Sequence, residues 1–453
     1  MIIETSKGKI RGVDMGDYTE YRGIPYAAPP VGSLRWKAPQ DAEPWDGILD
    51  AVKFPNRCMQ QTKQDPPPDD AAPGERPPVP DYDREFYSDP AYLPPVSEDC
   101  LYLNIWVPKQ APGAPFPVAF WIHGGGFTGG YSSEMEFDGA QYCRRGVILV
   151  TVAYRCNVFG FLAHPWLSAE NENHISGNYG ILDQIKALEF VYENIAAFGG
   201  DPQNITIFGQ SAGAMSVQTL VSSPLTKDMI AKAILQSGGS YGIGLHRDIP
   251  LAEQEQNGIL LQEILQVDSL EALRSIPAEK LIDIQMEWTM RVGRPPGEIF
   301  LAPTLDHHLL EGTYYGLIDA GRIRDIPYMI GSTRNDILVT PGMIAKDIPS
   351  PLYQGSVAFS KKLEELGRKP AYVYYFTRQL PGDDYGAFHS AELWYMFGTL
   401  SRCWRPMEEH DYALSSRMLD YWTQFMKTGD PNGNGNPFWA PCAAENESVM
   451  ELC

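Results

Sequence analysis

A serine between two glycines gives the strongest chemical signal in the sequence. The pattern G-x-S-x-G fills residues 209–213, after an apolar run that suits a strand, 205–208, and before an apolar run that suits a helix, 212–220. A serine on such a sharp strand-to-helix turn exposes its hydroxyl, and the amides at the start of the helix point toward any nearby anion. The pattern is common by chance, but the strand and the helix that it needs are both indicated. We therefore predict that Ser211 is a nucleophile rather than part of a structural turn.

A hydroxyl nucleophile needs a general base, and histidine is the usual one. In hydrolases with this turn, the chain order is serine, then acid, then histidine. Among the eight histidines, only His389 and His410 lie far enough beyond a predicted strand at 328–330 to leave room for the acid. His410 lies in a charged run ahead of a predicted helix, which indicates a solvent-exposed face. His389 lies in a loop of small residues after a predicted strand at 372–376, and we predict that it is the base.

The acid must orient the histidine and stabilise the cation that forms on it. Asp336 is well placed for this role, because the segment 331–336 directly follows the predicted strand at 328–330. The residues alone leave four other carboxylates open as alternatives: Asp306, Glu311, Asp383 and Asp384. Asp336 is the acid that we predict from its position after the strand.

Three consecutive glycines, 124–126, follow another predicted strand at 118–122. An oxyanion site needs backbone amides with no side chain between them and the substrate oxygen, which a run of glycines provides. A flexible turn is the alternative, but a turn does not need three glycines directly after a buried strand. We predict that the glycine run forms an oxyanion site and that His123, just before it, is a structural hydrogen-bonding residue.

These residues need a scaffold that brings them together. The apolar runs at 118–122 and 147–154 are typical of strands covered on both faces in a largely parallel sheet, and residues 180–198 have the apolar spacing of a helix. Strands alternate with helices and no repeat is evident, so we predict a single α/β domain over residues 1–453. From about residue 64 to 96 the chain is rich in proline, which breaks helices and strands, and we predict an extended surface loop there.

The composition excludes several classes of protein. The chain has 453 residues, of which 43% are hydrophobic, which is ample for a buried core and excludes global disorder. With 36 Lys and Arg against 57 Asp and Glu, the net charge of −21 disfavours nucleic acid and anionic membranes as partners. The longest apolar stretch, 147–154, is too short to span a bilayer. The N-terminal residues lack the pattern of a secretory signal, so we expect a cytoplasmic protein.

Further motifs make the chain resemble the type B carboxylesterases, the family that includes the cholinesterases. The resemblance covers nearly the whole chain and is most specific between about residues 97 and 240. The matching motifs are YRGIPY at 21–26, SEDCLYLN at 97–104, HGGGF at 123–127, NVFGF at 157–161, GNYGILDQ at 177–184, FGGDP at 198–202, the serine turn and residues 386–397. The resemblance implies the α/β-hydrolase fold, with a central, mostly parallel, twisted sheet and helices on both of its faces.

The resemblance also implies roles for individual residues. It places the oxyanion-hole amides at Gly125, Gly126 and Ala212. It places the acid of the triad at Asp336, where the family usually has Glu followed by Gly. Here Ile337 stands in place of that glycine, and the shorter carboxylate of Asp336 is chemically adequate for the same role.

Other positions bear on the compartment and the substrate. Cys58 and Cys100 fall where secreted relatives form a disulfide, but in a cytoplasmic protein we expect free thiols. Gln210 stands where cholinesterases carry Glu, so the anionic contact for a choline head is missing. The interval from Asp336 to His389 is much shorter than in the animal enzymes, which predicts a wider and more open pocket.

Together these observations predict a serine esterase that needs no cofactor and acts on uncharged carboxylic esters through an acyl-enzyme intermediate. An amidase, a thioesterase or a lactonase could use the same machinery. A non-catalytic adhesion protein built on this fold is disfavoured by the presence of Ser211 and His389. The sequence has no H-E-x-x-H motif or cluster of metal ligands, so we expect no metal. The expected partner is a small-molecule ester, and the choice between monomer and homodimer stays open.

Overall fold

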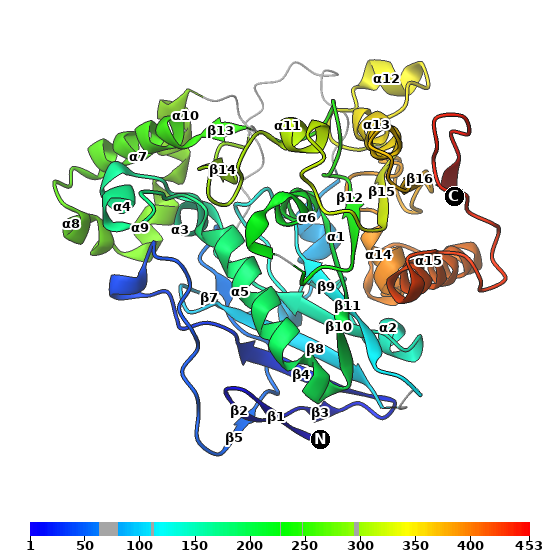
Figure 1. The fold of residues 1–453 in the computed structure, drawn as a ribbon, viewed down its shortest axis with the longest axis horizontal. Coiled ribbons are helices and arrows are strands. Elements are labelled where there is room, and N and C mark those ends of the chain that lie inside the picture. The colour runs from blue at the N-terminus through cyan, green and yellow to red at the C-terminus, as the bar shows by residue number, and fades with distance from the viewer. Residues whose placement is uncertain (63–79, 110–112, 227, 247, 294–298) are drawn as a thin grey trace.

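A ten-stranded sheet forms the centre of the computed structural model, which describes residues 1–62, 80–109, 113–226, 228–246, 248–293 and 299–453 (Figure 1). In spatial order its strands are β17 (Val449–Leu452), β16 (Tyr372–Phe376), β15 (Tyr328–Thr333), β12 (Lys232–Gln236), β11 (Gly200–Gln210), β9 (Phe116–Ile122), β10 (Ile148–Val152), β8 (Tyr102–Pro108), β4 (Tyr18–Pro25) and β3 (Val13–Asp14). The strands from β17 to β10 pair in parallel, whereas β8, β4 and β3 pair antiparallel at the other end. The predicted largely parallel α/β sheet is therefore confirmed.

The register of the parallel strands brings several carboxyl ends to one edge of the sheet. Ile122, the last residue of β9, is paired with Gly209 of β11. Gln236, the last residue of β12, is paired with both Gln210 of β11 and Gly331 of β15. The glycine run, the serine turn and the segment that follows β15 therefore leave the sheet beside one another. In open α/β sheets this edge is where ligands bind.

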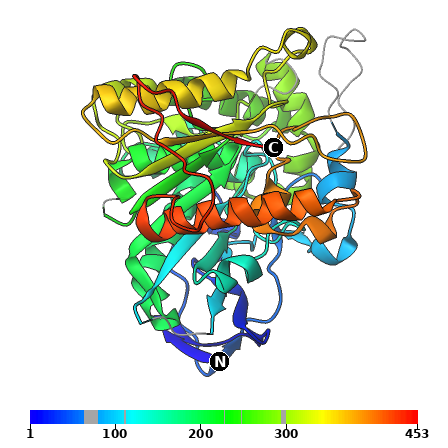
Figure 2. The ribbon, with the colours of Figure 1, turned by 90° about the vertical axis from the view of Figure 1, so that its right-hand side faces the viewer.

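Alternate residues of the central strands face two separate apolar cores. Phe120 of β9 belongs to the core that also contains residues of α5 (Tyr179–Asn194), α6 (Ala212–Ser222) and α13 (Pro351–Glu365). Its neighbour Trp121 points the other way, into the core formed with α2 (Ala140–Arg144), α14 (Leu393–Phe397) and α15 (Glu409–Thr428). Figure 2 shows α13, in yellow, and α15, in orange-red, on opposite sides of the sheet. Because helices cover both faces of the sheet, successive residues of the central strands are apolar rather than alternating apolar and polar.

The remaining elements surround this layered centre. The smaller sheets are β1 (Ile2–Thr5) with β2 (Gly8–Arg11) and β5 (Ile48–Asp50), β6 (Arg57–Cys58) with β7 (Val96–Ser97), and β13 (Ile249–Pro250) with β14 (Thr304–Leu305). The other α-helices are α1 (Tyr82–Phe86), α3 (Asn157–Phe161), α4 (Pro165–Glu170), α7 (Leu251–Leu265), α8 (Leu270–Arg274), α9 (Ala278–Asp283), α10 (Gln285–Val292), α11 (Tyr314–Asp319) and α12 (Pro341–Ala345). Short 3-10 helices cover Gly32–Leu34, Pro90–Tyr92, Ile195–Phe198, Pro224–Thr226 and Leu400–Arg402. Among the helices in the described ranges, none has the length and apolar character needed to cross a membrane.

The proline-rich segment differs from its prediction. Residues 64–79 of it lie outside the described residues, but the rest is not an extended loop throughout, because it contains α1 and a 3-10 turn at Pro90–Tyr92. Residues 81–87 carry no proline, and the Asp81 side chain caps α1 by accepting a hydrogen bond from the Arg84 amide at 3.1 Å. Phe86 buries its ring in the core beside α14 and α15. The prediction of an extended surface loop was therefore wrong for this part, since the prolines flank a helix rather than interrupt it.

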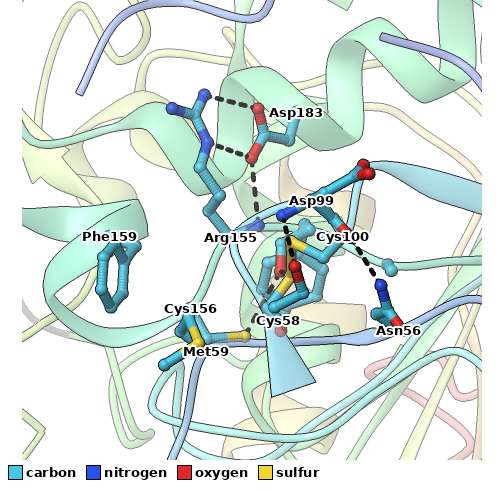
Figure 3. The surroundings of a disulfide bond; sticks show 12 residues. Asn56, Cys58, Met59, Asp99, Cys100, Arg155, Cys156, Phe159 and Asp183 are labelled. Atoms are coloured by element: carbon cyan, nitrogen blue, oxygen red, sulfur yellow. Dashed lines mark hydrogen bonds and ion pairs between the residues drawn. A yellow bond between two sulfur atoms is a disulfide. The ribbon is translucent and has the colours of Figure 1, made fainter. Parts of the chain in front are cut away.

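Cys58 and Cys100 form a disulfide bond in this structure, so the prediction of free thiols was wrong (Figure 3). The parallel pairing of β6 with β7 brings the two chain segments together, and the two Cα atoms lie 5.1 Å apart. Both cysteines are buried. The prediction rested on the expected compartment, which carries no information about this geometry.

Candidate active site

Ser211 lies on the sharp turn between β11 and α6, as predicted. Its backbone has φ 56° and ψ −126°, a conformation that residues other than glycine rarely adopt. A Cβ atom on Gly209 would lie 2.5 Å from the backbone carbon of Gly213, and one on Gly213 would lie 2.1 Å from the Ile122 carbonyl oxygen. Both flanking glycines are therefore required by close backbone contacts. The turn is held further by the Ser211 amide, which donates to the Gln236 carbonyl at 2.9 Å.

His389 and Asp336 lie together, although 53 residues separate them in the sequence. His389 Nδ1 donates to Asp336 Oδ1 at 2.5 Å, the contact expected between an orienting acid and a general base. Asp336 is buried at the end of β15, and His389 lies in the loop that follows β16, the neighbouring parallel strand. The pairing of adjacent strands thus brings the predicted acid to the predicted base.

Asp336 is held by three further donors. The Ser237 hydroxyl donates to Oδ2 at 2.6 Å and the Thr333 amide donates to the same oxygen at 3.0 Å. The Ile337 amide donates to Oδ1 at 2.8 Å. Hydrogen bonds to an ionised carboxylate favour the charged form and fix its orientation. Ser237 was not found from the sequence, although its place directly after β12 at the shared sheet edge could have indicated it.

The four alternative acids are engaged elsewhere or exposed. Asp306 accepts from the Asn178 amide group at 2.8 Å and from the Leu309 backbone amide at 2.8 Å, so it organises its own loop. Glu311 forms an ion pair with Arg322 near the surface, and Asp383 forms one with Arg405. Asp384 is exposed. The structure brings only Asp336, of these five carboxylates, to the His389 imidazole.

The glycine run lies directly against the serine turn. A Cβ atom on Gly124 would lie 2.9 Å from the Gln210 carbonyl oxygen and 3.1 Å from Ser211 Cβ. Gly125 and Gly126 have φ values of 97° and 62°, in the region that favours glycine. Within the described residues, no protein acceptor takes a hydrogen bond from the amides of Gly125, Gly126 and Ala212. Three free amides beside a serine hydroxyl can hold a developing oxyanion.

The other two histidines of the argument lie where the sequence suggested. His123 is buried, stacks on Tyr154 with ring centroids 4.3 Å apart, and its Nδ1 donates to the Gly124 carbonyl at 3.0 Å. Burial lowers the pKa of His123 to about 4, so the imidazole stays neutral at ordinary pH. His410 is exposed near the start of α15.

The side-chain amide of Gln210 contacts Nε2 of His389, the ring nitrogen that a general base would use. Its side-chain Nε2 lies 3.2 Å from His389 Nε2, and with Nδ1 carrying the proton toward Asp336, the amide of Gln210 donates to that nitrogen. Among the described contacts, Ser211 Oγ makes no hydrogen bond to His389. The sequence singled out Gln210 only as a missing negative charge. Its contact with the imidazole could not be read from the pattern, because it depends on a side-chain rotamer.

Glu392 is a second carboxyl near Asp336 and His389 that the sequence did not indicate. It begins the turn into α14, its side chain is fully buried, and Gln236 Nε2 donates to its Oε1 at 3.5 Å. Burial, and then the negative charge of Asp336, raise the pKa of Glu392 to about 7. Its place three residues after His389 is the signal that could have pointed to it.

A cavity of about 470 Å³ opens beside Gly125, and neither Ser211 nor His389 is among the residues that line it. Its wall mixes polar and apolar surface and includes Arg57, Gln60, Asp83, Tyr87, Thr128 and Tyr131. In the part of the chain that the structure describes, no group of three or more His, Cys, Asp or Glu residues is arranged to hold a metal ion. The more open pocket and the absence of a cofactor stay predictions.

The chain is similar in sequence to known proteins over nearly its whole length. The sequence model of the Carboxylesterase family matches residues 1–362 and 350–453. The para-nitrobenzyl esterase of Bacillus subtilis (strain 168) is 32% identical over 476 aligned residues, which cover 95% of this chain and 90% of that enzyme. The fumonisin B1 esterase of Sphingopyxis macrogoltabida is 36% identical over 342 residues, covering 74% of this chain but only 56% of that enzyme.

Solved structures agree with the sequence comparison. A structure of PNB esterase superposes with a TM-score of 0.84 at 29% identity and covers 100% of this chain and 96% of that one. A structure described as a thermophilic PNB esterase gives the same TM-score at 30% identity, with the same coverage. These likenesses extend over the sheet, both helical layers and the edge that carries Ser211, His389 and Asp336.

Proposed function

Because the chain belongs to the carboxylesterase family and is a serine carboxylic ester hydrolase, we propose that Ser211 is its nucleophile, His389 its general base and Asp336 its orienting acid. The observation that carries this assignment is the 2.5 Å contact between His389 Nδ1 and Asp336 Oδ1, at the sheet edge where Ser211 leaves β11. The strained backbone of Ser211 and the free amides beside it support the same roles.

The reaction proceeds in two halves through an acyl-enzyme. Ser211 Oγ bonds to the ester carbonyl carbon and gives its proton to His389 Nε2, while Asp336 stabilises the imidazolium. The amides of Gly125, Gly126 and Ala212 hold the oxyanion. The bond to the alcohol oxygen then breaks, and the alcohol leaves with the proton from His389. Water attacks the acyl-enzyme in the same way and releases the carboxylic acid and the free serine.

Gln210 must move before the first proton transfer. In the structure its amide donates to His389 Nε2, the nitrogen that has to accept the proton of Ser211. Because Gln210 is uncharged, it places no carboxylate beside the substrate, which supports our proposal that the substrates are uncharged esters.

Serine labelling and mutation test the nucleophile. The purified protein should hydrolyse short-chain nitrophenyl esters, and a phosphonate that reacts with activated serines should attach to the peptide containing Ser211. Ser211→Ala should abolish both the turnover and the label while the circular dichroism spectrum stays unchanged. Full turnover in the folded variant would overturn the assignment.

The acyl and alcohol groups that the enzyme prefers can be determined by comparing its kcat/KM values for a panel of esters. The para-nitrobenzyl esterase that resembles this chain gives nitrobenzyl esters as the first group to try. Matched amides, thioesters and lactones would show whether the enzyme is specific for oxygen esters. A kcat/KM for an amide or a thioester equal to that for the matched ester would overturn our proposal that esters are the preferred substrates.

We further propose that residues 1–453 form one domain that acts on a small-molecule ester in the cytoplasm. The apolar core on one face of the sheet includes Ile3 near the start of the chain and Cys442 near its end, which supports a single folding unit. A disulfide such as Cys58–Cys100 is more typical of oxidising compartments. Immunoblotting of separated cell fractions tests the location, and recovery of the protein outside the cytoplasmic fraction would overturn this part of the proposal.

A further inference from the structure

The helix α1 lies against the loop that carries His389, although about 300 residues separate them in the sequence. We call residues 377–392, between β16 and α14, the histidine loop. On one side this loop is held by Asn335, whose backbone amide donates to the Ala387 carbonyl at 2.9 Å and whose Oδ1 accepts from the Ala387 amide at 3.0 Å. On another side it meets α1, which belongs to the chain segment closed by the Cys58–Cys100 disulfide.

Tyr82 of α1 contacts the histidine loop at His389 itself. The Tyr82 hydroxyl donates to the His389 carbonyl at 3.0 Å. The Tyr82 ring meets the ring of Phe388 edge to face, with centroids 6.4 Å apart and an interplanar angle of 90°. Burial raises the pKa of Tyr82 far above its usual range, so the hydroxyl keeps the proton that it donates. The backbone of His389 is thus fixed by Tyr82, while its ring is fixed by Asp336.

Glu85 holds α1 in this place through buried hydrogen bonds. It is 1% exposed and accepts from the indole nitrogens of Trp394 and Trp404 at 3.0 and 2.8 Å. Arg405 Nε donates to both of its oxygens at 3.0 Å. The Arg405 guanidinium also lies 5.1 Å from the ring centroid of Phe388. Phe388, the neighbour of His389, is therefore near both Tyr82 and the arginine that Glu85 binds.

We propose that Tyr82 is a positioning residue for His389 and that Glu85 anchors α1 so that Tyr82 can act, an inference that rests on the proposed role of His389 as general base. The imidazole has to serve Ser211 and the leaving alcohol in turn, and small displacements of a reacting group lower rates steeply. The helix α1 is therefore part of the structure that holds the base.

Tyr82→Phe is the decisive variant, because it removes one hydroxyl and keeps the ring against Phe388. We expect kcat for a nitrophenyl ester to fall about tenfold, the effect of one lost hydrogen bond at the base, with KM changed less than about twofold. Tyr92→Phe is the matched control: it is the same substitution in the same segment, and its hydroxyl makes no hydrogen bond to the described residues. Equal kcat values for Tyr82→Phe and the wild type would overturn the proposal.

A second comparison separates positioning from a general structural effect. In a His389→Ala background, Tyr82→Phe should leave the residual rate unchanged, because the group that it positions is gone. A tenfold loss that persists without the imidazole would show that Tyr82 acts elsewhere and would overturn the inference. Glu85→Gln, assayed where circular dichroism shows it folded, should lower kcat without raising KM, and an unchanged kcat would refute its anchoring role.

The two proposals fail in different ways. If Ser211→Ala retained full turnover, the proposed function itself would fall, whatever Tyr82→Phe did. If Ser211→Ala were inactive and Tyr82→Phe matched the wild type, the inference about Tyr82 alone would fall.

Discussion

Replacing the buried Glu392 with glutamine should change how the stability of the protein depends on pH. The side chain is fully buried, and among the described residues its Oε2 has no hydrogen-bond partner. Burial and the charge of Asp336 raise its pKa from 4.5 to about 7. Glutamine has nearly the same shape, can still accept from Gln236, and does not ionise.

The magnitude and the sign follow from the two pKa values. A pKa of about 7 in the folded state against 4.5 in the unfolded state, at 1.36 kcal/mol per pH unit, corresponds to about 3.4 kcal/mol. The folded protein binds this proton more tightly, so the stabilisation is complete below pH 4.5. It is lost as the pH rises through 7, where Glu392 ionises inside the protein. The glutamine variant escapes this loss and should become relatively more stable by about 3 kcal/mol toward pH 8.

Urea denaturation of both proteins at pH 5, 6, 7 and 8 measures this difference. Other buried carboxyls such as Glu134, whose pKa burial raises to about 7, also make the wild type less stable at high pH. Their contribution is common to both proteins and cancels in the difference between the two midpoints, provided that the slopes of the transitions agree. A difference that stays constant from pH 5 to pH 8 would show that Glu392 does not carry a raised pKa, and would refute the reasoning.

Two further substitutions probe the triad. Asp336→Asn should lower kcat by about 10⁴ because the amide cannot stabilise the imidazolium, and a rate within tenfold of the wild type would exclude Asp336 as the acid. Gln210→Glu should place a carboxylate about 3.2 Å from His389 Nε2, where even in water the attraction to an imidazolium is about 1.3 kcal/mol. Ionised His389 cannot act as base, so the acidic limb of the kcat/KM profile should move upward by about 1 pH unit, and an unshifted limb would show that residue 210 does not contact the imidazole in solution.

The main elements of the fold could be predicted because each buried strand is a continuous run of apolar residues in the sequence. The predicted strand at 372–376 is β16, and the apolar runs 118–122 and 147–154 contain the cores of β9 and β10. A buried parallel sheet requires apolar residues on both faces, and this requirement is visible in any single strand. The helix α1 was missed because the many prolines across about 64–96 drew attention away from the nine residues without proline, 81–89, that contain it.

The residues of the candidate site fall into two groups, those that the sequence pattern indicated and those that only the packed structure shows. Ser211, His389 and Asp336 each follow a strand end, so the order of strands was enough to bring them together. Ser237, Gln210 and Tyr82 hold these groups through side-chain contacts whose partners are 99, 179 and 307 residues away in the sequence. No local pattern encodes such contacts, because they exist only once the sheet and α1 have packed. The sequence thus indicates the candidate reacting groups at the turns, whereas the contacts that orient or occlude them depend on the packing of distant segments.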